Sequence, residues 1–324
     1  MACFVSCMQR TAYLNRGLNS VRTFVTSHNF LSQNASHGVD IGLAAPHRQR
    51  RIIRRSRASA IRDCRSQAQL EAEARHRTLK IPLDKVKEVW EETSGPYHIR
   101  DVASHYGIFK DLFDGASFVP YVPLSISYSQ MSGEHVPVFR GNIVTPSESA
   151  QAPDISYSAS DDSLWTLLLT NPDGHLQDND AEYVHWLIGN IPGNRIGEGE
   201  TLVDYLTPFP VRGTGYHRLI FILFKQQSRI SFDEEQQQLP CHSLSARRFK
   251  TLDFYAKYQD VITPAGLGFF QSRWDQSVQS TFHQTLCMRE PVFEYDAPKQ
   301  YIAPQQKWPH RKPIHYLKKF LPKD

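Results

Sequence analysis

The sequence has few cysteines and no paired ones. Among its 324 residues there are five cysteines and no Cys-x-x-Cys pair, the five being Cys3, Cys7, Cys64, Cys241 and Cys287. An odd, scattered set argues against a disulfide framework and against a zinc finger, and it is typical of a reducing compartment. Long apolar runs are also missing, because the longest, Leu219–Phe224, falls far short of the roughly 20 residues that cross a bilayer. We therefore predict no membrane span.

Motifs that mark common enzymes are absent as well. The chain has no Gly-x-Ser-x-Gly elbow, no P-loop and no His-Glu-x-x-His, and no cysteine stands beside a plausible base. The acidic runs Asp161-Asp162 and Asp233-Glu234-Glu235 are interpreted as solvated loops. We expect a protein that is not an enzyme, with no cofactor, no catalytic residue and no metal site.

Acidic residues are rare at both ends of the chain, so charge falls into three blocks. Residues 1–80 hold 14 Lys and Arg against 4 Asp and Glu, residues 81–300 hold 17 against 28, and residues 301–324 hold 6 against 1. The overall charge of +4 therefore hides an acidic body between two basic ends. Such a chain would hold RNA or another phosphate-rich partner at its ends.

Residues 1–26 are predicted to be a mitochondrial transit peptide. No Asp or Glu precedes Asp40, while Arg10, Arg16 and Arg22 are spaced among Ser, Thr, Asn and apolar residues. Wound as a helix, this segment would place an apolar stripe beside cationic side chains, which is the pattern of a transit peptide. The alternative is a disordered basic tail of a cytosolic protein.

Residues 27–66 are predicted to be an Arg-rich extended arm, and residues 298–324 a basic C-terminal tail rich in Pro, Lys, Arg and His. Guanidinium groups bind phosphate through paired hydrogen bonds and stack on bases, which suits RNA. The alternative for the arm is a longer transit peptide that is removed entirely. The predicted RNA-binding residues are Arg48, Arg50, Arg51, Arg54, Arg55, Arg57, Arg62, Arg65, Lys307, Arg311, Lys312, Lys318 and Lys319.

Residues 67–115 are predicted to be a helical extension. Apolar periodicity indicates one helix over about 68–92, interrupted at Pro82, and a second over Tyr97–Phe113 that Gly115 closes. From Phe118 the period changes to that of β-strands, with runs at Val122–Tyr128, Val136–Phe139, Leu164–Thr170, Tyr183–Ile188 and Leu219–Phe224. Residues 245–285 are expected to be helical or irregular. The fold class is therefore mainly β (α+β), with an antiparallel or mixed sheet.

Three short motifs gather the chemically informative residues near the ends of these strands. They are Asn171-Pro172-Asp173-Gly174, Tyr183–Asn190 with His185 inside it, and Gly213-Thr214-Gly215-Tyr216-His217-Arg218. If the strands pair, Asp173, His185 and His217 could line one pocket, where imidazoles and a Gly-rich turn can hold a phosphate or carboxylate. Two alternatives stay open: a metal site of two histidines and a carboxylate, or histidines that are simply hydrogen-bonded in the core.

The three motifs, in this order, resemble the phosphatidylethanolamine-binding protein family over about Phe118–Glu290. The resemblance implies a β-sheet sandwich over residues 116–297, with a small anion pocket partly covered by the C-terminal segment. Its pocket positions correspond to Asp173, His185, Pro210 and His217. The sequence departs from the family pattern at several neighbouring positions, namely Asn171, His175, Tyr183, Val211 and Leu219. These changes alter charge and hydrogen bonding, so we expect a degenerate pocket on a retained fold.

The whole arrangement resembles a mitochondrial ribosomal member of that family. The resemblance implies a structural role in the central protuberance of the mitochondrial large ribosomal subunit, in the matrix. Its partners would be large-subunit rRNA and other mitochondrial ribosomal proteins of the central protuberance. The alternative function is a mitochondrial protein that binds phosphate or a lipid headgroup in the retained pocket.

Overall fold

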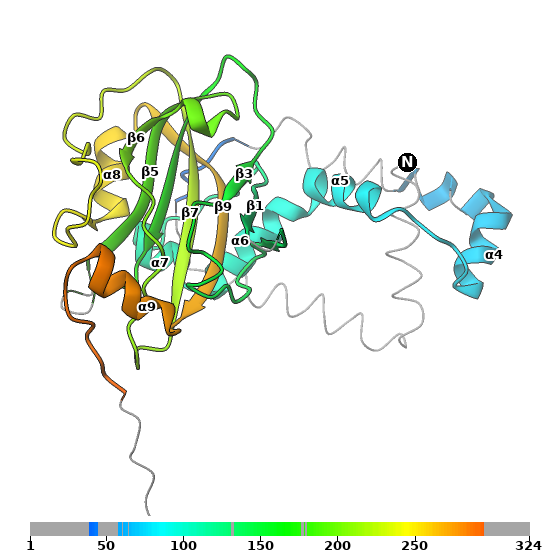
Figure 1. Cartoon of the computed structure of the whole chain (residues 1–324). Helices are drawn as coiled ribbons and strands as arrows, with labels where there is room; N and C mark the ends of the chain where they lie inside the picture. The colour runs from blue at the N-terminus through cyan, green and yellow to red at the C-terminus, as the bar shows by residue number, and fades with distance from the viewer. Residues whose placement is uncertain are drawn as a thin grey trace, which may run out of the picture.

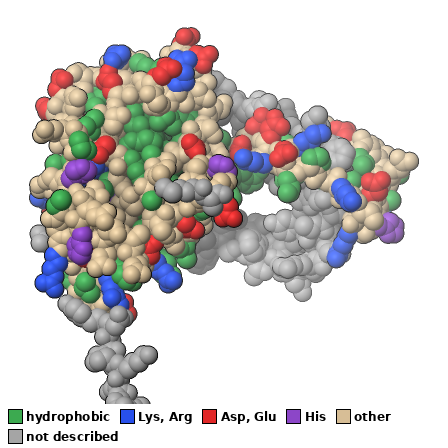
Figure 2. Space-filling view, in the orientation of Figure 1, with side chains coloured by type: hydrophobic (Ala, Val, Ile, Leu, Met, Phe, Trp, Pro, Cys, Tyr) green, Lys and Arg blue, Asp and Glu red, His purple; other side chains and the backbone are tan. Residues whose placement is uncertain are grey.

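The computed structural model describes residues 39–44 and 58–294, except residues 60, 64, 131, 132, 176, 177 and 179. Most of them form one β-rich domain, from which a helical segment projects to one side (Figure 1). Basic and acidic side chains both lie on the surface of this segment (Figure 2). Across this described part, none of the helices is long and apolar enough to cross a membrane.

A six-stranded antiparallel sheet is the centre of the domain. Its main path runs β6-β5-β4-β7-β9, and the short β8 pairs with β5. The strands are β4 (Leu164–Asn171), β5 (Glu182–Pro192), β6 (Glu200–Val203), β7 (Tyr216–Gln226), β8 (Arg248–Phe249) and β9 (Ile262–Arg273). The 3-10 turn Ile196–Glu198 connects β5 to β6.

Both faces of this sheet are buried, which explains why its central strands are continuous apolar runs. In β7 the side chains of Ile220, Ile222 and Phe224 pack into one cluster, whereas Leu219 and Phe221 pack into another. Successive side chains of a strand point to opposite faces, so the sheet separates two hydrophobic layers. These two layers make the domain a sandwich.

One face is covered by helices and the other by a small sheet. The helices are α6 (Gly95–His105), α7 (Ile108–Phe113) and α8 (Thr251–Tyr258), and Ile99, Phe113 and Phe254 from them join the first cluster. The small sheet has the order β2-β1-β3, with β1 (Ser125–Ser129), β2 (His135–Pro137) and β3 (Asp154–Ser156). Beyond one end of the large sheet lie α9 (Ser277–Ser280) and a π-helical turn (Thr281–Thr285). The predicted mainly β, α+β sandwich is confirmed.

The predicted helical extension begins with two helices that project from the domain, α4 (Ala68–His76) and α5 (Leu83–Thr93) (Figure 1). Neither has a buried residue. The C-terminal end of α5 is attached through Trp90, whose ring lies under the guanidinium of Arg140 at 4.2 Å from the ring centroid. A cation over an aromatic face is an attractive contact, so this pair fixes where the projecting helices leave the domain.

Part of the predicted N-terminal arm lies against the domain. The Ile41 N–H donates to the Ser117 carbonyl at 3.1 Å, and the Leu43 N–H donates to the Pro264 carbonyl at 3.3 Å. Between them, a Cβ on Gly42 would stand only 2.6 Å from the Cβ of Phe118. Only glycine allows so close an approach. Residues 39–44 therefore form an anchor, while residues 61–63, further along the arm, are helical.

Two of our expectations for local structure are wrong. The single helix predicted over Tyr97–Phe113 is divided into α6 and α7 at Gly107, which has φ +72°. Residues 245–285, expected to be helical or irregular, contain the twelve-residue strand β9. Two glycines interrupt the apolar pattern of β9, and packing needs both of them. A Cβ on Gly266 would stand 2.8 Å from the Val122 carbonyl oxygen, and one on Gly268 would stand 2.9 Å from Ile126.

Candidate functional site

The predicted pocket residues gather at one end of the large sheet. Asn171 ends β4 and pairs with Tyr183 of β5, and Asp173 follows in the turn. His185 lies in β5 and His217 in β7, on either side of β4. The fourth residue, Pro210, is buried in the segment that follows β6. Antiparallel pairing around β4 therefore brings the three motifs to one end of the sheet.

Asp173 is held by Arg218. The Arg218 Nε donates to Asp173 Oδ2 at 2.8 Å, its Nη2 donates to Oδ1 at 2.6 Å, and its backbone N–H also donates to Oδ2 at 2.8 Å. Burial alone would raise the pKa of Asp173, but the bonds to Arg218 outweigh it and lower that pKa. Such paired, charge-assisted bonds are strong and directional. The carboxylate is thus occupied by the protein itself.

The same guanidinium also reaches the helical extension. Its Nη1 donates to Asp111 Oδ2 of α7 at 2.7 Å and to the Tyr106 carbonyl at 2.7 Å. Arg218 therefore joins the Asp173 turn and β7 to the α6–α7 junction. We call the four residues Tyr106, Asp111, Asp173 and Arg218 the Arg218 clamp.

Both nitrogens of His217 have neighbours. Thr214 Oγ1 donates its one proton to the Val211 carbonyl at 2.7 Å, so it accepts from His217 Nε2 at 2.6 Å. The other nitrogen, Nδ1, lies 3.4 Å from the side-chain amide nitrogen of Asn171, which can only donate. Burial lowers the pKa of His217 to about 4, although Asp173 opposes the shift. His217 is therefore a neutral ring whose N–H is used internally.

His185 is fully buried and has one unpartnered nitrogen. Its Nδ1 is 2.9 Å from the Leu206 carbonyl oxygen, so this nitrogen carries the proton and donates. Its Nε2 has no hydrogen-bond partner. Burial lowers the pKa of His185 to about 3, and the nearby charge of Arg247 acts in the same direction. The ring consequently offers a buried lone pair, not an N–H, at Nε2.

Arg247, which has no exposed surface, holds the backbone around His185. Its guanidinium donates to the His185 carbonyl at 3.3 Å and to the Asp204 carbonyl at 2.9 Å. It also donates to the Asp204 carboxylate at 2.7 Å. These bonds satisfy carbonyls at the gap between β6 and β8, so Arg247 has a structural role there.

Aromatic rings fill the space next to His185. The Phe209 ring lies 5.1 Å from the His185 ring and 5.8 Å from Tyr183, centroid to centroid. Phe282, from the π-helical turn, packs edge-on against Phe209 at 5.6 Å. Phe209 and Phe282 are both buried in a third hydrophobic cluster. The end of the sheet is therefore closed by an aromatic layer, with no free imidazole N–H beneath it.

The chain is similar to known proteins of one family. A family model described as phosphatidylethanolamine-binding protein matches residues 127–262. The chain carries a phosphatidylethanolamine-binding protein domain. The chain is 29% identical, over 145 residues, to a Drosophila melanogaster protein that carries the name odorant-binding protein A5. That alignment covers 44% of this chain and 68% of the relative.

Two solved structures were also matched. One is a carboxypeptidase Y inhibitor complexed with its cognate proteinase, at 20% identity and a TM-score of 0.45, covering 56% of this chain and 97% of that one. The other is the phosphatidylethanolamine-binding protein from Plasmodium vivax, at 20% identity and a TM-score of 0.39, covering 54% and 97% of the two chains.

Several residues that decide the site were not foreseen from the sequence. Asp173 was assigned to the pocket, whereas its carboxylate is bound by Arg218. The sequence contained one indication of this contact. Because side chains of successive strand residues point to opposite faces, Arg218 had to lie on the face away from the His217 side chain. Phe209 and Phe282 are far apart in sequence and gave no such indication. Among the described residues, no group of three His, Cys, Asp or Glu side chains is arranged to hold a metal ion.

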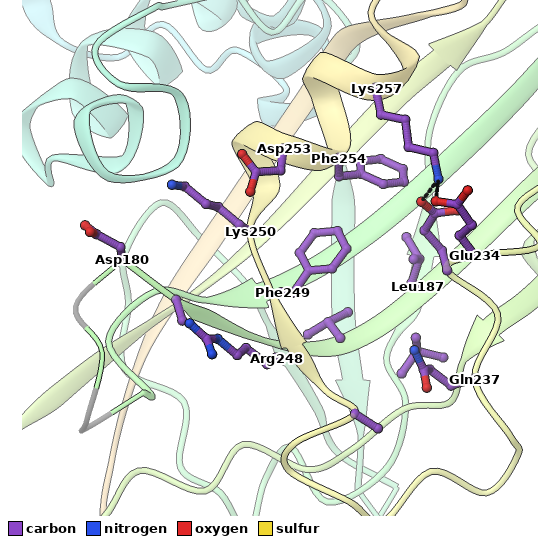
Figure 3. Close-up of a pocket in the computed structure, with 15 residues that line it drawn as sticks. Asp180, Leu187, Glu234, Gln237, Arg248, Phe249, Lys250, Asp253, Phe254 and Lys257 are labelled. Atoms are coloured by element: carbon purple, nitrogen blue, oxygen red, sulfur yellow. Dashed lines mark hydrogen bonds and ion pairs between the residues drawn. The ribbon is translucent and has the colours of Figure 1, made fainter.

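A cavity of about 440 Å³ lies elsewhere on the domain, beside β8 and α8 (Figure 3). None of the four predicted pocket residues lines it. Its walls include Leu187, Val203, Phe249 and Phe254, and charged side chains stand around them. Nothing in the sequence pointed to this cavity, because its lining comes from four separate segments.

Only two of the predicted RNA-binding residues fall within the described part of the chain. Arg62 and Arg65 lie in a helical stretch before α4, and both are exposed. The others, in 48–57 and 307–319, lie outside the described residues. Exposed arginines on the projecting segment are compatible with contacts to phosphate.

Proposed function

We propose that the protein is a structural constituent of the mitochondrial large ribosomal subunit, located in the central protuberance and supporting mitochondrial translation. The observation that carries the proposal is the separation of charge: an acidic body stands between ends with excesses of 10 and 5 basic residues, from counts of 14 against 4 and 6 against 1. The proposal is supported by a resemblance in overall arrangement to the large-subunit mitochondrial ribosomal protein numbered thirty-eight.

The mechanism follows from counterion release. Each phosphate neutralised by Lys or Arg frees condensed cations from the RNA, which favours the complex and makes it sensitive to salt. The Arg-rich arm and the basic tail would bind large-subunit rRNA in this way. The acidic body would then face neighbouring ribosomal proteins. A transit peptide at residues 1–26 would bring the chain to the matrix.

The geometry of the site supports a structural role over catalysis. Asp173 is ion-paired with Arg218 at 2.6 Å, and the N–H of each pocket imidazole is used within the protein. A general acid or base needs a titratable group within reach of a substrate. Both histidines instead have lowered pKa values, and the His185 ring packs against Phe209 of the buried aromatic layer.

Sucrose-gradient sedimentation of mitochondrial lysate tests the proposal. The tagged protein should migrate with the large subunit and leave that position when low magnesium dismantles the subunit. Deleting residues 48–65 should abolish incorporation, whereas replacing their arginines by lysine should retain part of it, because charge persists but paired phosphate contacts do not. A protein that stays at the top of the gradient at both magnesium concentrations would contradict the proposal.

One observation favours a second candidate, binding of phosphate or a lipid headgroup in the retained pocket. His185 Nε2 is buried without a partner, and a ligand could occupy that position. This nitrogen is unprotonated, however, and phosphate oxygens need donors. Calorimetry with phosphorylethanolamine and with phosphate decides between the candidates, since a binding heat that disappears in His217→Ala would favour the second.

A further inference from the structure

We propose that the cavity beside β8 and α8 is a docking site for a basic segment of a neighbouring protein, with one apolar side chain of that segment seated in the cavity. Three properties of the cavity carry this inference: its floor, the charge around it and its position on the acidic body. The inference depends on the proposed function only for the source of the segment.

The floor of the cavity is apolar and well supported. Leu187, Val203 and Phe254 are buried in the first hydrophobic cluster. Phe249 is half-buried, and its ring lies 5.5 Å from that of Phe254. A cavity of about 440 Å³ has room for a leucine or an aromatic side chain. Protein partners commonly contribute one such anchor residue to a desolvated pocket.

The rim of the cavity is acidic once its own ion pairs are counted. Lys257 is shared by Glu234 and Glu235, and Arg248 is paired with Asp178. The third cation, Lys250, lies on one side of the cavity, where Figure 3 shows it beside Asp253. The charged lining residues are the carboxylates Asp180, Glu234, Glu235 and Asp253 and the cations Arg248, Lys250 and Lys257, and Asp178, outside the lining, neutralises Arg248. With Asp178 counted, five carboxylates against three cations leave a net charge of −2.

This combination selects among possible partners. RNA would bring phosphates against carboxylates, which is unfavourable. A basic protein segment would complement the rim, and its apolar residue would cover the half-exposed Phe249. Complementary charge also accelerates encounter and disfavours wrong partners. The chain's own basic tail is an alternative occupant, which the experiment distinguishes.

The purified full chain can be tested with two labelled peptides in fluorescence anisotropy. The probe is acetyl-Gly-Lys-Leu-Lys-Phe-Lys-Gly-amide, and its partner has glutamate in place of each lysine. At low ionic strength the lysine peptide should bind at least about tenfold more tightly than the glutamate peptide. The double variant Glu234→Lys with Asp253→Lys, which leaves the apolar floor intact, should weaken binding of the lysine peptide about tenfold.

The matched control is Asp161→Lys with Asp162→Lys, which makes the same charge change at two exposed residues outside the cavity. It should alter affinity less than about twofold. Equal binding of the two peptides, or an equal loss in the control, overturns the proposal. Failure of the peptide to bind, while the protein still sediments with the large subunit, refutes docking and leaves the ribosomal role standing.

The occupant in mitochondria is identified by photocrosslinking. With p-benzoylphenylalanine in place of Gln237, which lines the cavity, crosslinks should map to a Lys- or Arg-rich segment of another ribosomal protein. They should be lost in the Glu234→Lys, Asp253→Lys background. Crosslinks to residues 298–324 of the same chain, or to RNA, overturn the proposed occupant.

Discussion

Removing the guanidinium of the Arg218 clamp should destabilise the domain and loosen the helical extension. In Arg218→Met, Asp173 loses two side-chain bonds, and Asp111 and the Tyr106 carbonyl lose one each. Hydrogen bonds to charged groups contribute about 1.5–3 kcal/mol each when well formed. These contributions do not add in a shared network, and removing one partner of a buried ion pair costs about 3–5 kcal/mol in total. Because the Arg218 and Asp173 side chains are still 18% and 27% exposed, we expect a loss of about 3 kcal/mol, the lower end of that range.

The pairwise part of that loss can be isolated by a double-mutant cycle. Arg218→Met, Asp173→Asn and the double variant are unfolded in urea and followed by tryptophan fluorescence. The coupling energy should be about 2 kcal/mol. The control is the exposed pair Arg195–Glu198, whose side chains are 51% and 59% exposed, and it should give less than about 1 kcal/mol. A clamp coupling below about 0.5 kcal/mol would refute the reasoning.

The clamp also predicts a pH dependence with a definite sign. Arg218 lowers the pKa of Asp173 against the opposing effect of burial, from a usual value of 3.8. The stability it contributes is therefore present above that value and is lost as the pH falls through the lowered pKa. The difference in unfolding free energy between wild type and Asp173→Asn should shrink in this acidic range.

Hydrogen exchange of the α7 amides should become faster in Arg218→Met if the clamp holds that helix.

Three further predictions concern two buried histidines, the buried Glu182 and the close approach at Gly42. Burial lowers the pKa of His185 to about 3 and of His217 to about 4. The unfolded state therefore binds protons at these histidines more readily than the folded state does. The unfolding free energy measured in urea should fall by about 2–3 kcal/mol from pH 7.5 to 5.5, and His217→Gln should remove about half of that fall. Glu182 shows the opposite sign, because burial raises its pKa above 4.5 although two threonines donate to it. Its contribution to stability is present below that value and lost as the pH rises through the raised pKa, so Glu182→Gln should flatten that part of the urea-derived profile. Gly42→Ala would place a Cβ 2.6 Å from Phe118, which should cost about 1–3 kcal/mol and release the 39–44 anchor to limited proteolysis; unchanged proteolysis would contradict the close approach.

Two of the correctly predicted strands lie in a uniform environment. Leu164–Thr170 and Leu219–Phe224 are continuous apolar runs because both faces of β4 and β7 are buried. Strand β9 was missed because its glycines belong to a contact between sheets: a Cβ on Gly268 would stand 2.9 Å from Ile126. A glycine that is required by a contact with a residue distant in sequence leaves no local pattern, so β9 could not be recognised from the sequence.

The order of the three motifs predicted which residues share one end of the sheet, but it did not predict their interactions. His185 and His217 were identified, yet the direction of their hydrogen bonds depends on Leu206 and Thr214. Likewise, nothing near Asn171 in the sequence indicates Phe282, which closes the same end of the sheet. The motifs therefore predicted which residues make up the site, while tertiary contacts determine whether the site can bind an anion.

The two attachments of the N-terminal region have a mechanical consequence for the proposed role. The domain holds residues 39–44 through backbone hydrogen bonds and Trp90 through Arg140. The stretch of sequence between these two attachments includes the predicted RNA-binding arginines of 48–65, so it is tied at both ends. A segment with both ends fixed explores fewer positions than a free tail, and the entropy lost on binding is correspondingly smaller. Releasing one end by Gly42→Ala should therefore weaken incorporation into the large subunit without removing any arginine. Measured in the same gradients, unchanged incorporation of this variant would show that the arm binds RNA as an independent tail.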